Sequence, residues 1–134
     1  MIRIYADMGA DLFHYGHMRF LKKAHALGDH LLVGICADDV LVSYKRRPIL
    51  TMEERVASVA GCRYVDEVLP NAPPMVDRAW IEKYDIDLVV HGDDYSQEQQ
   101  EYYYKVPIEM GIFRTVAYTQ SISTTEIIRR CKES

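Results

Sequence analysis

Short apolar runs alternate with amphipathic segments along the whole chain. Short apolar runs bounded by turn-forming residues are typical of strands in a sheet that is covered on both faces. Such runs predict strands at residues 3–6, 31–36, 65–69, 88–90 and 115–118. Segments with apolar residues three and four apart are typical of helices that pack on one side. They predict helices at residues 15–27, 51–62, 76–84, 97–110 and 123–132.

Individual residues mark the ends of several of these elements. Thr51 and Glu54 have the spacing of a capping box, which predicts that a helix begins there. Gly28 stands where the first helix should end. Pro70 should close the third strand, and Pro107 should interrupt or kink its helix, because proline has no backbone N–H to donate.

The order of the elements predicts the fold class and the place of the ligand site. Strands that alternate with helices form a parallel sheet with helices on both faces. We therefore predict an α/β protein: one Rossmann-like domain over residues 1–134, with a five-stranded parallel sheet. Sheets of this kind bind ligands beyond the C-terminal strand ends, where the strand order reverses. The chemistry should lie in the loops after the first and fourth strands and at the start of the last helix.

The charge of the chain favours a small anionic ligand over a nucleic acid. Acidic residues outnumber basic ones by 20 to 16, which gives a net charge of -4. A nucleic-acid binder needs a basic face for the phosphate backbone, so we expect no nucleic-acid partner. A nucleotide needs only a local group of donors, such as Lys45-Arg46-Arg47 or Arg129-Arg130. The first of these runs is either a solvated surface or a mobile flap that brings Lys45 over phosphates, with Arg46 and Arg47 solvated.

Neither a membrane nor an oxidising compartment is indicated. No apolar run approaches the roughly 18 residues of a membrane span, and residues 1–5 enter a strand-like pattern rather than a signal peptide. Cys36, Cys62 and Cys131 are an odd number without zinc-ligand spacing. We expect a cytoplasmic protein with reduced thiols, no integral membrane contact and no metal-ligating residues.

The first predicted loop carries two histidines three residues apart. His14 and His17 straddle a helix start with Gly16 between them, so both imidazoles would face one small space. The positive end of the helix dipole suits phosphate and keeps histidine neutral. Neutral N–H donors aimed at phosphorus would stabilise charge in a transition state. The alternative is two incidental histidines, one of them packed among the apolar residues of the helix.

Three hydroxyl residues stand in a row where the last helix begins. Ser123, Thr124 and Thr125 precede Glu126 with the spacing of a capping box, and helix capping alone would explain them. Their place after the last strand also suits hydroxyls that hold the terminal phosphates of a nucleotide. Both interpretations stay open at this point.

Several segments together resemble the cytidylyltransferase family. Residues 11–17 resemble the family's HxGH signature with its preceding Asp, and residues 122–125 resemble its second signature, Ile-Ser-Thr. Residues 63–68 are similar to the arginine-containing stretch of the choline-phosphate, ethanolamine-phosphate and glycerol-3-phosphate enzymes. Residues 33–39 and 91–94 also fall where those enzymes have similar segments. The resemblance covers nearly the whole chain, in order.

The resemblance implies an activity and a set of site residues. The activity is transfer of CMP from CTP to a phosphorylated or phosphonate small alcohol, with release of pyrophosphate. A magnesium ion, Mg2+, would bridge the triphosphate. His14, His17 and Lys45 would be catalytic. The implied nucleotide-binding residues are Gly9, Ala10, Asp11, His14, His17, His91, Asp94, Ser123, Thr124 and Thr125. The implied substrate-binding residues are Arg63, Asp93 and Tyr95. A homodimer that pairs around residues 63–66 is also implied.

Two departures from the family pattern bear on the activity. Family members usually have Gly-Thr-Phe or Gly-Ile-Phe before the Asp, where this chain has Met8-Gly9-Ala10. The second signature usually begins Arg-Thr-x-Gly, where this chain has Tyr118-Thr119-Gln120-Ser121. One expected phosphate contact is thereby lost, and Arg114 and Arg129 are the candidate replacements. A catalytically weak, nucleotide-binding regulatory relative remains an alternative.

The acceptor is the part that the sequence determines least. The choline enzymes have Trp where this chain has Pro74, so one wall of an aromatic cage for a quaternary ammonium is missing. Tyr95 and the run Tyr102-Tyr103-Tyr104 either supply other walls or form helix surface. We expect an amino-alcohol phosphate such as phosphoethanolamine or phosphocholine, or a related phosphonate. Glycerol-3-phosphate as the acceptor and ATP in place of CTP stay open, because HxGH does not choose the base.

Overall fold

The structure of the protein, a computed structural model, describes residues 1–134 apart from the side chain of Tyr44. Within the described residues, five strands form one sheet in the order β3-β2-β1-β4-β5, and all neighbouring strands run parallel. The strands are β1 (Arg3–Met8), β2 (His30–Cys36), β3 (Glu67–Ala72), β4 (Leu88–Gly92) and β5 (Phe113–Val116). The predicted α/β class and five-stranded parallel sheet are confirmed.

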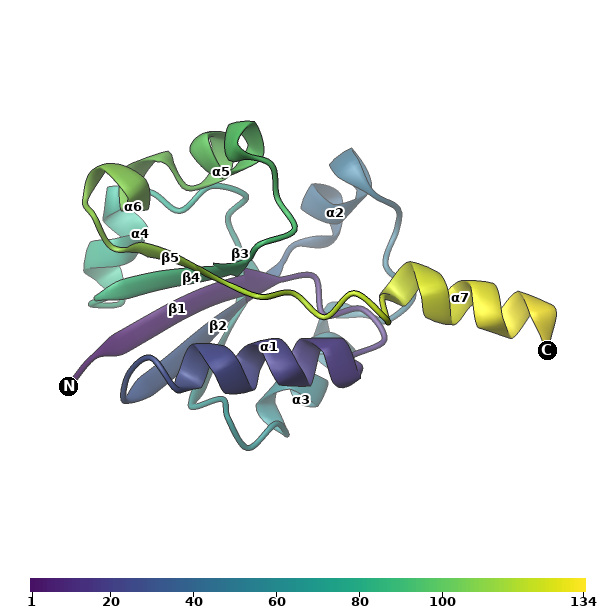
Figure 1. The fold of residues 1–134 in the computed structure, drawn as a ribbon. Helices are drawn as coiled ribbons and strands as arrows, with labels where there is room; N and C mark the ends of the chain where they lie inside the picture. Colours follow the sequence, from purple (N-terminus) through teal and green to yellow (C-terminus); the bar gives the residue numbers. More distant parts are fainter.

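Helices cover both faces of this sheet (Figure 1). One face is covered by α1 and α3 and the other by α4, α5 and α6, which confirms the Rossmann-like arrangement. The helices are α1 (Tyr15–His25), α2 (Asp38–Tyr44), α3 (Met52–Ala60), α4 (Arg78–Lys83), α5 (Gln97–Tyr103), α6 (Lys105–Glu109) and α7 (Thr124–Glu133). Among the described residues, no helix has the length and apolar character needed to cross a membrane.

Each face of the sheet has its own hydrophobic core, and β1 contributes to both. Ile4 and Ala6 pack in the cluster that includes α1 and α3, whereas Tyr5 lies in the cluster on the opposite face. This is the alternation expected of a strand, in which successive side chains point to opposite faces. Because both faces are covered, β2 is apolar almost throughout and β1 is apolar from Ile4 to Ala6, which is the pattern that predicted them in the sequence.

The third strand departs from its prediction at Pro70. The sequence predicts a strand that ends before this proline, but β3 begins at Glu67 and runs through Pro70 to Ala72. The proline is tolerated because β3 lies at the edge of the sheet, paired only with β2, where a missing N–H need not cost a ladder bond. Past the proline, Asn71 has φ 55° and the pairing register with β2 shifts.

The helix predicted over residues 97–110 is two helices, and the break does not lie at Pro107. Tyr104 separates α5 from α6 with φ -123° and ψ 26°. Pro107 falls in the first turn of α6, where its missing N–H has no helical partner to lose. The break allows the Tyr104 side chain to enter the core, where it is 3% exposed.

The segment after β2 also differs from its prediction. The sequence predicts a loop there, but α2 occupies residues 38–44 and Lys45 is its C-cap residue. Asp38 and Asp39 lie in the first turn of α2, where carboxylates interact favourably with the helix dipole. Lys45 therefore follows a short helix rather than a strand, and a loop connects it to α3.

The predicted helix ends have different outcomes. The capping box at Thr51 is confirmed, since its hydroxyl accepts from Glu54 N and the Glu54 carboxylate accepts from Thr51 N. The prediction for Gly28 is wrong, because α1 ends at His25 and is capped by Ala26. Gly28 instead permits close packing on β1, where an added Cβ would come within 2.7 Å of Ile4 Cδ1.

Candidate active site

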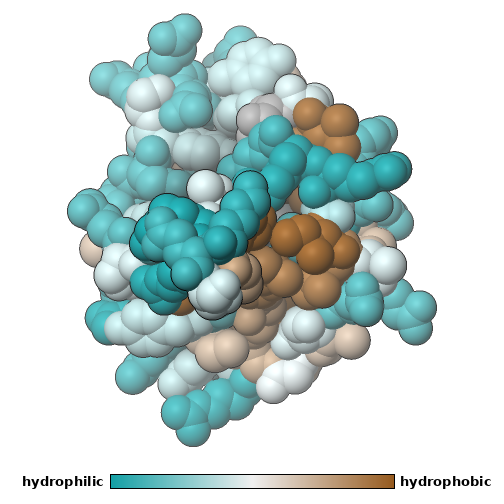
Figure 2. All heavy atoms as spheres, turned by 90° about the vertical axis from the view of Figure 1, so that its right-hand side faces the viewer, coloured by the Kyte–Doolittle hydropathy of each residue, from teal (hydrophilic) through white to brown (hydrophobic). Residues whose placement is uncertain are grey.

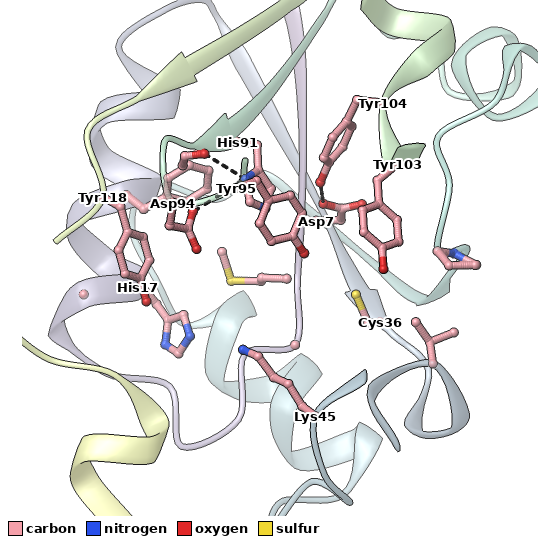
Figure 3. A pocket seen from close by; sticks show the side chains of 17 residues that line it. Asp7, His17, Cys36, Lys45, His91, Asp94, Tyr95, Tyr103, Tyr104 and Tyr118 are labelled. Atoms are coloured by element: carbon pink, nitrogen blue, oxygen red, sulfur yellow. Dashed lines mark hydrogen bonds and ion pairs between the residues drawn. The ribbon is translucent and has the colours of Figure 1, made fainter. Parts of the chain in front are cut away.

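A cavity opens at the C-terminal ends of β1 and β4, where the order of the strands reverses (Figure 3). We call it the main cavity. Its lining comes from the end of β1, from α1, from the ends of β2 and β4, and from the tyrosines of α5 and the last loop. Its lining includes Asp7, Gly9, His17, Cys36, Lys45, Pro74, His91, Asp94, Tyr95, Tyr103, Tyr104 and Tyr118. Its place agrees with the rule for ligand sites in open α/β sheets.

A second, smaller cavity adjoins the main one, and we call it the small cavity. It is lined by Gly9, Ala10, Asp11, His17, Leu41, Lys45, Arg46, Pro48 and Thr124. Gly9, His17 and Lys45 line both cavities and so form a shared border between them. The Lys45 ammonium points toward the main cavity near the ring of His17 (Figure 3).

The two histidines cap the start of α1 reciprocally. Nδ1 of His14 accepts from Gly16 N at 3.0 Å, and Nδ1 of His17 accepts from His14 N at 3.0 Å. Because both Nδ1 atoms accept, each neutral ring carries its proton on Nε2. A neutral Nε2–H is a hydrogen-bond donor suited to a phosphate oxygen. The capping that fixes this helix end therefore also fixes which nitrogen of each ring donates.

Both histidines are held neutral by their surroundings. Burial lowers the pKa of His17 to about 3, and the charges of His14 and Lys45 act in the same direction. Burial also lowers the pKa of His14. His17 lines both cavities, whereas His14 lines neither and is buried, with its ring 3.9 Å from that of His17. The geometry thus separates a half-buried donor that lines the cavities, His17, from a buried partner that does not, His14.

Asp11 is part of a junction between three segments. Its carboxylate accepts from Ile49 N and Leu50 N, each at 2.9 Å, and its carbonyl accepts from the Thr124 hydroxyl at 2.7 Å. The residue lines the small cavity, but both carboxylate oxygens are engaged by backbone amides. Asp11 therefore fixes the loop after Lys45 against the start of α7.

The three hydroxyl residues predicted to bind phosphate have different positions. Ser123 caps α7, accepting from Glu126 N at 3.0 Å, as the capping interpretation predicts. Thr124 lines the small cavity. Thr125 accepts a hydrogen bond of 3.1 Å from Arg46 Nη1, across 79 residues of sequence. Only Thr124 among the three lines a cavity.

The residues predicted to bind the acceptor are not all brought together. Among them Tyr95 lines the main cavity, as do His91 and Asp94 from the predicted nucleotide-binding set. The carboxylate of Asp93 accepts from Tyr118 N at 2.9 Å, which joins the turn after β4 to the last loop. Arg63 does not reach either cavity; it lies in a separate groove with Phe13, Met18, Cys62 and Tyr64.

Asp7 is a site residue that the sequence reasoning missed, and so is its contact with Tyr104, which was named only as a possible wall of an aromatic cage. Asp7 lies one residue before the end of β1 and accepts a hydrogen bond of 2.5 Å from the Tyr104 hydroxyl (Figure 3). Burial raises the pKa of Asp7, and burial also raises that of Tyr104 well above its ordinary value. A carboxylate at the C-terminal end of a central strand could have been recognised in the sequence as a candidate site residue. Its contact with a tyrosine 97 residues away could not.

Arg55 is a second missed residue, and it acts behind the site. It is fully buried and donates to Gly9 O at 2.8 Å and to Cys36 O at 2.9 Å. It also pairs with the carboxylate of Asp38 at the start of α2. One side chain on α3 thus fixes the loop after β1, the end of β2 and the start of α2.

The described residues do not form a ready site for a resident metal. No group of three or more His, Cys, Asp or Glu side chains among them is placed to hold an ion. The acidic residue of the small cavity, Asp11, already accepts two amide hydrogen bonds. Mg²⁺ binds mainly to substrate phosphates in sites of this type.

Residues 9–130 match the model of the family described as cytidylyltransferase-like, and the chain belongs to this family. It is 46% identical to an ethanolamine-phosphate cytidylyltransferase of Dictyostelium discoideum and 50% identical to one of Arabidopsis thaliana. Each match covers 95% of this chain but only 37% and 32% of the respective relative. The chain therefore spans about a third of the length of these curated relatives.

A solved structure supports the fold. The lipopolysaccharide core biosynthesis protein from Thermoplasma volcanium superposes with a TM-score of 0.75, covering 90% of this chain and 99% of that protein. The two sequences are 24% identical. The likeness therefore concerns the arrangement of strands and helices.

Proposed function

We propose that this chain transfers CMP from CTP to phosphoethanolamine and releases pyrophosphate. The observation that carries the proposal is the main cavity, which joins a neutral imidazole and a lysine at one border to a buried carboxylate ringed by tyrosines. The names of the two relatives point to the same acceptor. Because the relatives are about three times longer, the activity of the whole protein belongs to this proposal.

The proposed reaction is a direct displacement at the α-phosphorus of CTP. A phosphate oxygen of the acceptor forms a bond to this phosphorus, and the bond to the β-phosphate oxygen breaks, so pyrophosphate leaves with its electron pair. Nε2–H of His17 and the ammonium of Lys45 would donate to the α-phosphate oxygens from the shared border. Positioning and charge stabilisation supply the catalysis, and no covalent enzyme intermediate is needed.

The far end of the main cavity suits the ammonium group of the acceptor. Asp7 is a carboxylate held in a largely desolvated place, and burial raises its pKa. An ammonium that donates to it would stabilise its charged form. Rings of Tyr95, Tyr104 and His91 lie together there, with His91 4.2 Å from Tyr95 and 5.3 Å from Tyr104. Aromatic faces attract a cation, whereas the hydroxyls of glycerol-3-phosphate would leave Asp7 uncompensated.

The nucleotide would occupy the rest of the two cavities. The α-phosphate lies at the shared border in this arrangement, because His17 and Lys45 are there. The outer phosphates would enter the small cavity beside Thr124 and the start of α7, whose N-terminus favours anions. Mg²⁺ would accompany the triphosphate as part of the substrate and neutralise some of its charge.

The experiment is a pyrophosphate-release assay with CTP and a panel of acceptors. Phosphoethanolamine should be turned over with the highest kcat/KM among phosphocholine, glycerol-3-phosphate and 2-aminoethylphosphonate. Substituting ATP for CTP tests the choice of base in the same assay. Binding of CTP with no pyrophosphate release for any acceptor would identify a regulatory relative instead and contradict the proposal.

A further inference from the structure

Neither arginine suggested as a replacement for the missing family arginine reaches the cavities. Arg114 lies on the edge strand β5 and donates to Phe113 O at 2.9 Å, in a different groove. Arg129 is exposed on α7 and forms ion pairs with Glu126 and Glu133 at 2.6 and 2.7 Å. A residue other than Arg114 and Arg129 must therefore supply the phosphate contact that the departure at residues 118–121 removes.

Arg46 has the position that those two residues lack. It lines the small cavity together with Lys45 and Thr124. Its Nη1 donates to Thr125 Oγ1 at 3.1 Å, so the loop after α2 is joined to the start of α7. Its Nε atom is buried and has no hydrogen-bond partner among the described residues. The guanidinium as a whole is only partly buried, so its outer N–H donors are the ones that a ligand in the small cavity can reach.

The charge balance of the small cavity favours an anion. Two cationic side chains, Lys45 and Arg46, line it. The acid that lines it, Asp11, accepts hydrogen bonds from two backbone amides and so is already satisfied. The N-terminus of α7 adds the positive end of a helix dipole beside Thr124.

We propose that Arg46 binds the outer phosphates of the nucleotide and the pyrophosphate that leaves, in place of the arginine missing from the second signature. This inference rests on the proposed function and adds a binding residue to its site. The shared border places the α-phosphate between the cavities, so the β- and γ-phosphates extend toward Arg46. A guanidinium meets phosphate oxygens with paired N–H donors, which a lysine cannot do.

The same geometry separates Arg46 from its neighbour. The sequence suggests that Arg46 and Arg47 are both solvated members of a basic run. Arg47 is exposed and lines neither cavity. The interpretation as a solvated side chain therefore holds for Arg47 but not for Arg46. The two residues have the same charge and adjacent positions in one loop. Arg47→Ala is therefore a matched control for Arg46→Ala, with general electrostatic attraction nearly equal in both.

The test is isothermal titration calorimetry of pyrophosphate, CTP and CMP, each with Mg²⁺, on the wild type, Arg46→Ala, Arg46→Lys and Arg47→Ala. Arg46→Ala should weaken pyrophosphate and CTP binding by about 10- to 100-fold, the range of a lost charged hydrogen bond. CMP affinity should stay within about twofold, because CMP has no outer phosphates. Arg46→Lys should recover part of the loss, and Arg47→Ala should change each affinity by less than about threefold.

Several outcomes overturn the inference. It fails if Arg46→Ala binds pyrophosphate like the wild type, if CMP binding falls as much as CTP binding, or if Arg47→Ala has an equal effect. Pyrophosphate binding does not require turnover, so a wild type that binds it normally but forms no product contradicts the proposed function alone. A wild type that binds no pyrophosphate contradicts both. Thermal unfolding of each variant checks that the fold is retained.

Discussion

At the scale of single residues, Asp7 is subject to opposing demands of stability and binding. Burial raises the pKa of its carboxyl in the folded protein above the unfolded value of about 3.9. The stability that the protonated group contributes is present below that value and is lost as pH rises through the folded pKa. At neutral pH the charged carboxylate is therefore a cost to the folded state that a cationic ligand would offset.

Asp7→Asn should separate the two demands. The amide oxygen still accepts from Tyr104, so the variant should unfold at an equal or higher temperature at pH 7, with the gain disappearing at acidic pH. KM for phosphoethanolamine should rise by about 10- to 100-fold, the loss of a charged contact. Thermal unfolding between pH 4 and 8, together with steady-state kinetics, measures both effects. An unchanged KM for the acceptor would show that Asp7 does not bind its ammonium.

Thermal unfolding and steady-state kinetics together also test the two histidines. His14→Ala and His17→Ala should each lower kcat by about 100-fold, the effect of losing a preorganised transition-state donor or the residue that fixes it. Each also removes half of the capping at α1, so stability should fall by about 1 kcal/mol, which the sequence pattern alone did not suggest. His25→Ala, at the exposed end of α1, is the control and should keep wild-type kcat. Near wild-type turnover in both active-site variants would contradict the assignment.

His17 also predicts a feature of the pH profile. Its pKa of about 3 keeps it neutral throughout the usual assay range. In the unfolded chain a histidine binds a proton near pH 6.5. The stability contributed by neutral His17 is thus present above about pH 6.5 and is lost as pH falls toward 3. The acid destabilisation of the wild type in this interval should be smaller in His17→Ala.

At the scale of elements, the segment from α2 to α3 carries Lys45 between two fixed ends. Arg55 holds the start of this segment through Cys36 O and Asp38, and Asp11 holds its end through Ile49 N and Leu50 N. Lys45 itself is exposed, so only its neighbours restrict where its ammonium lies. This arrangement places a flexible charge at a defined border.

Lys45→Ala should therefore lower kcat strongly, by about 100-fold or more, while KM for CTP rises less. The reason is that a mobile cation contributes most after charge has accumulated on the α-phosphate oxygens. Steady-state kinetics on Lys45→Ala and Arg47→Ala measure the contrast, and Arg47→Ala should stay within about threefold of the wild type. A rise in KM alone for Lys45→Ala would show that Lys45 attracts anions in general and does not act in the chemical step.

Local sequence patterns predicted the elements whose cause is local. The apolar run at residues 31–36 and the capping box at Thr51 identify β2 and α3 because burial on both faces and N-cap chemistry depend on neighbouring residues. The path of β3 through Pro70 depends on its edge position, and the break at Tyr104 depends on a side chain that reaches Asp7. Neither cause is visible within a short window of sequence.

The residues of the candidate site were also predicted only where the sequence pattern is local. His17, His91 and Asp94 line the main cavity, and they stand in segments that a family pattern identifies. The contacts that complete the site join distant residues, such as Arg46 with Thr125. The role of Arg55 could not be predicted, because a basic residue in an amphipathic helix is expected on the exposed face, whereas here it is fully buried. Only the packing of three separate segments around it shows its role.

At the scale of the whole molecule, two surfaces are open to further contacts. One is the face from which α7 projects, where hydrophobic side chains gather beside a largely hydrophilic helix (Figure 2). The other is the groove between α1 and α3, lined by Phe13, Met18, Cys62, Arg63 and Tyr64 among others. The second contains the stretch around residues 63–66 through which the family resemblance predicts pairing. An exposed apolar groove of this kind is typical of a protein interface.

We predict a homodimer that buries the groove between α1 and α3. Sedimentation velocity at micromolar concentration should show a dimer, and Met18→Glu should shift it to a monomer by burying a charged side chain in the interface. Met18 is 43% exposed, so the monomer should still fold. Ile108→Glu, at a comparably exposed position on α6, is the matched control and should leave the dimer intact. A wild type that sediments only as a monomer would count against the prediction.

The central claim is that the chain joins CMP to phosphoethanolamine, and ³¹P NMR of the reaction mixture tests it most directly. With CTP, Mg²⁺ and phosphoethanolamine, the wild type should form a new diphosphate, CDP-ethanolamine, and free pyrophosphate in equal amounts. Neither product should form when the acceptor or the nucleotide is omitted. Consumption of CTP without a new diphosphate, or a spectrum unchanged at saturating substrates, would contradict the claim.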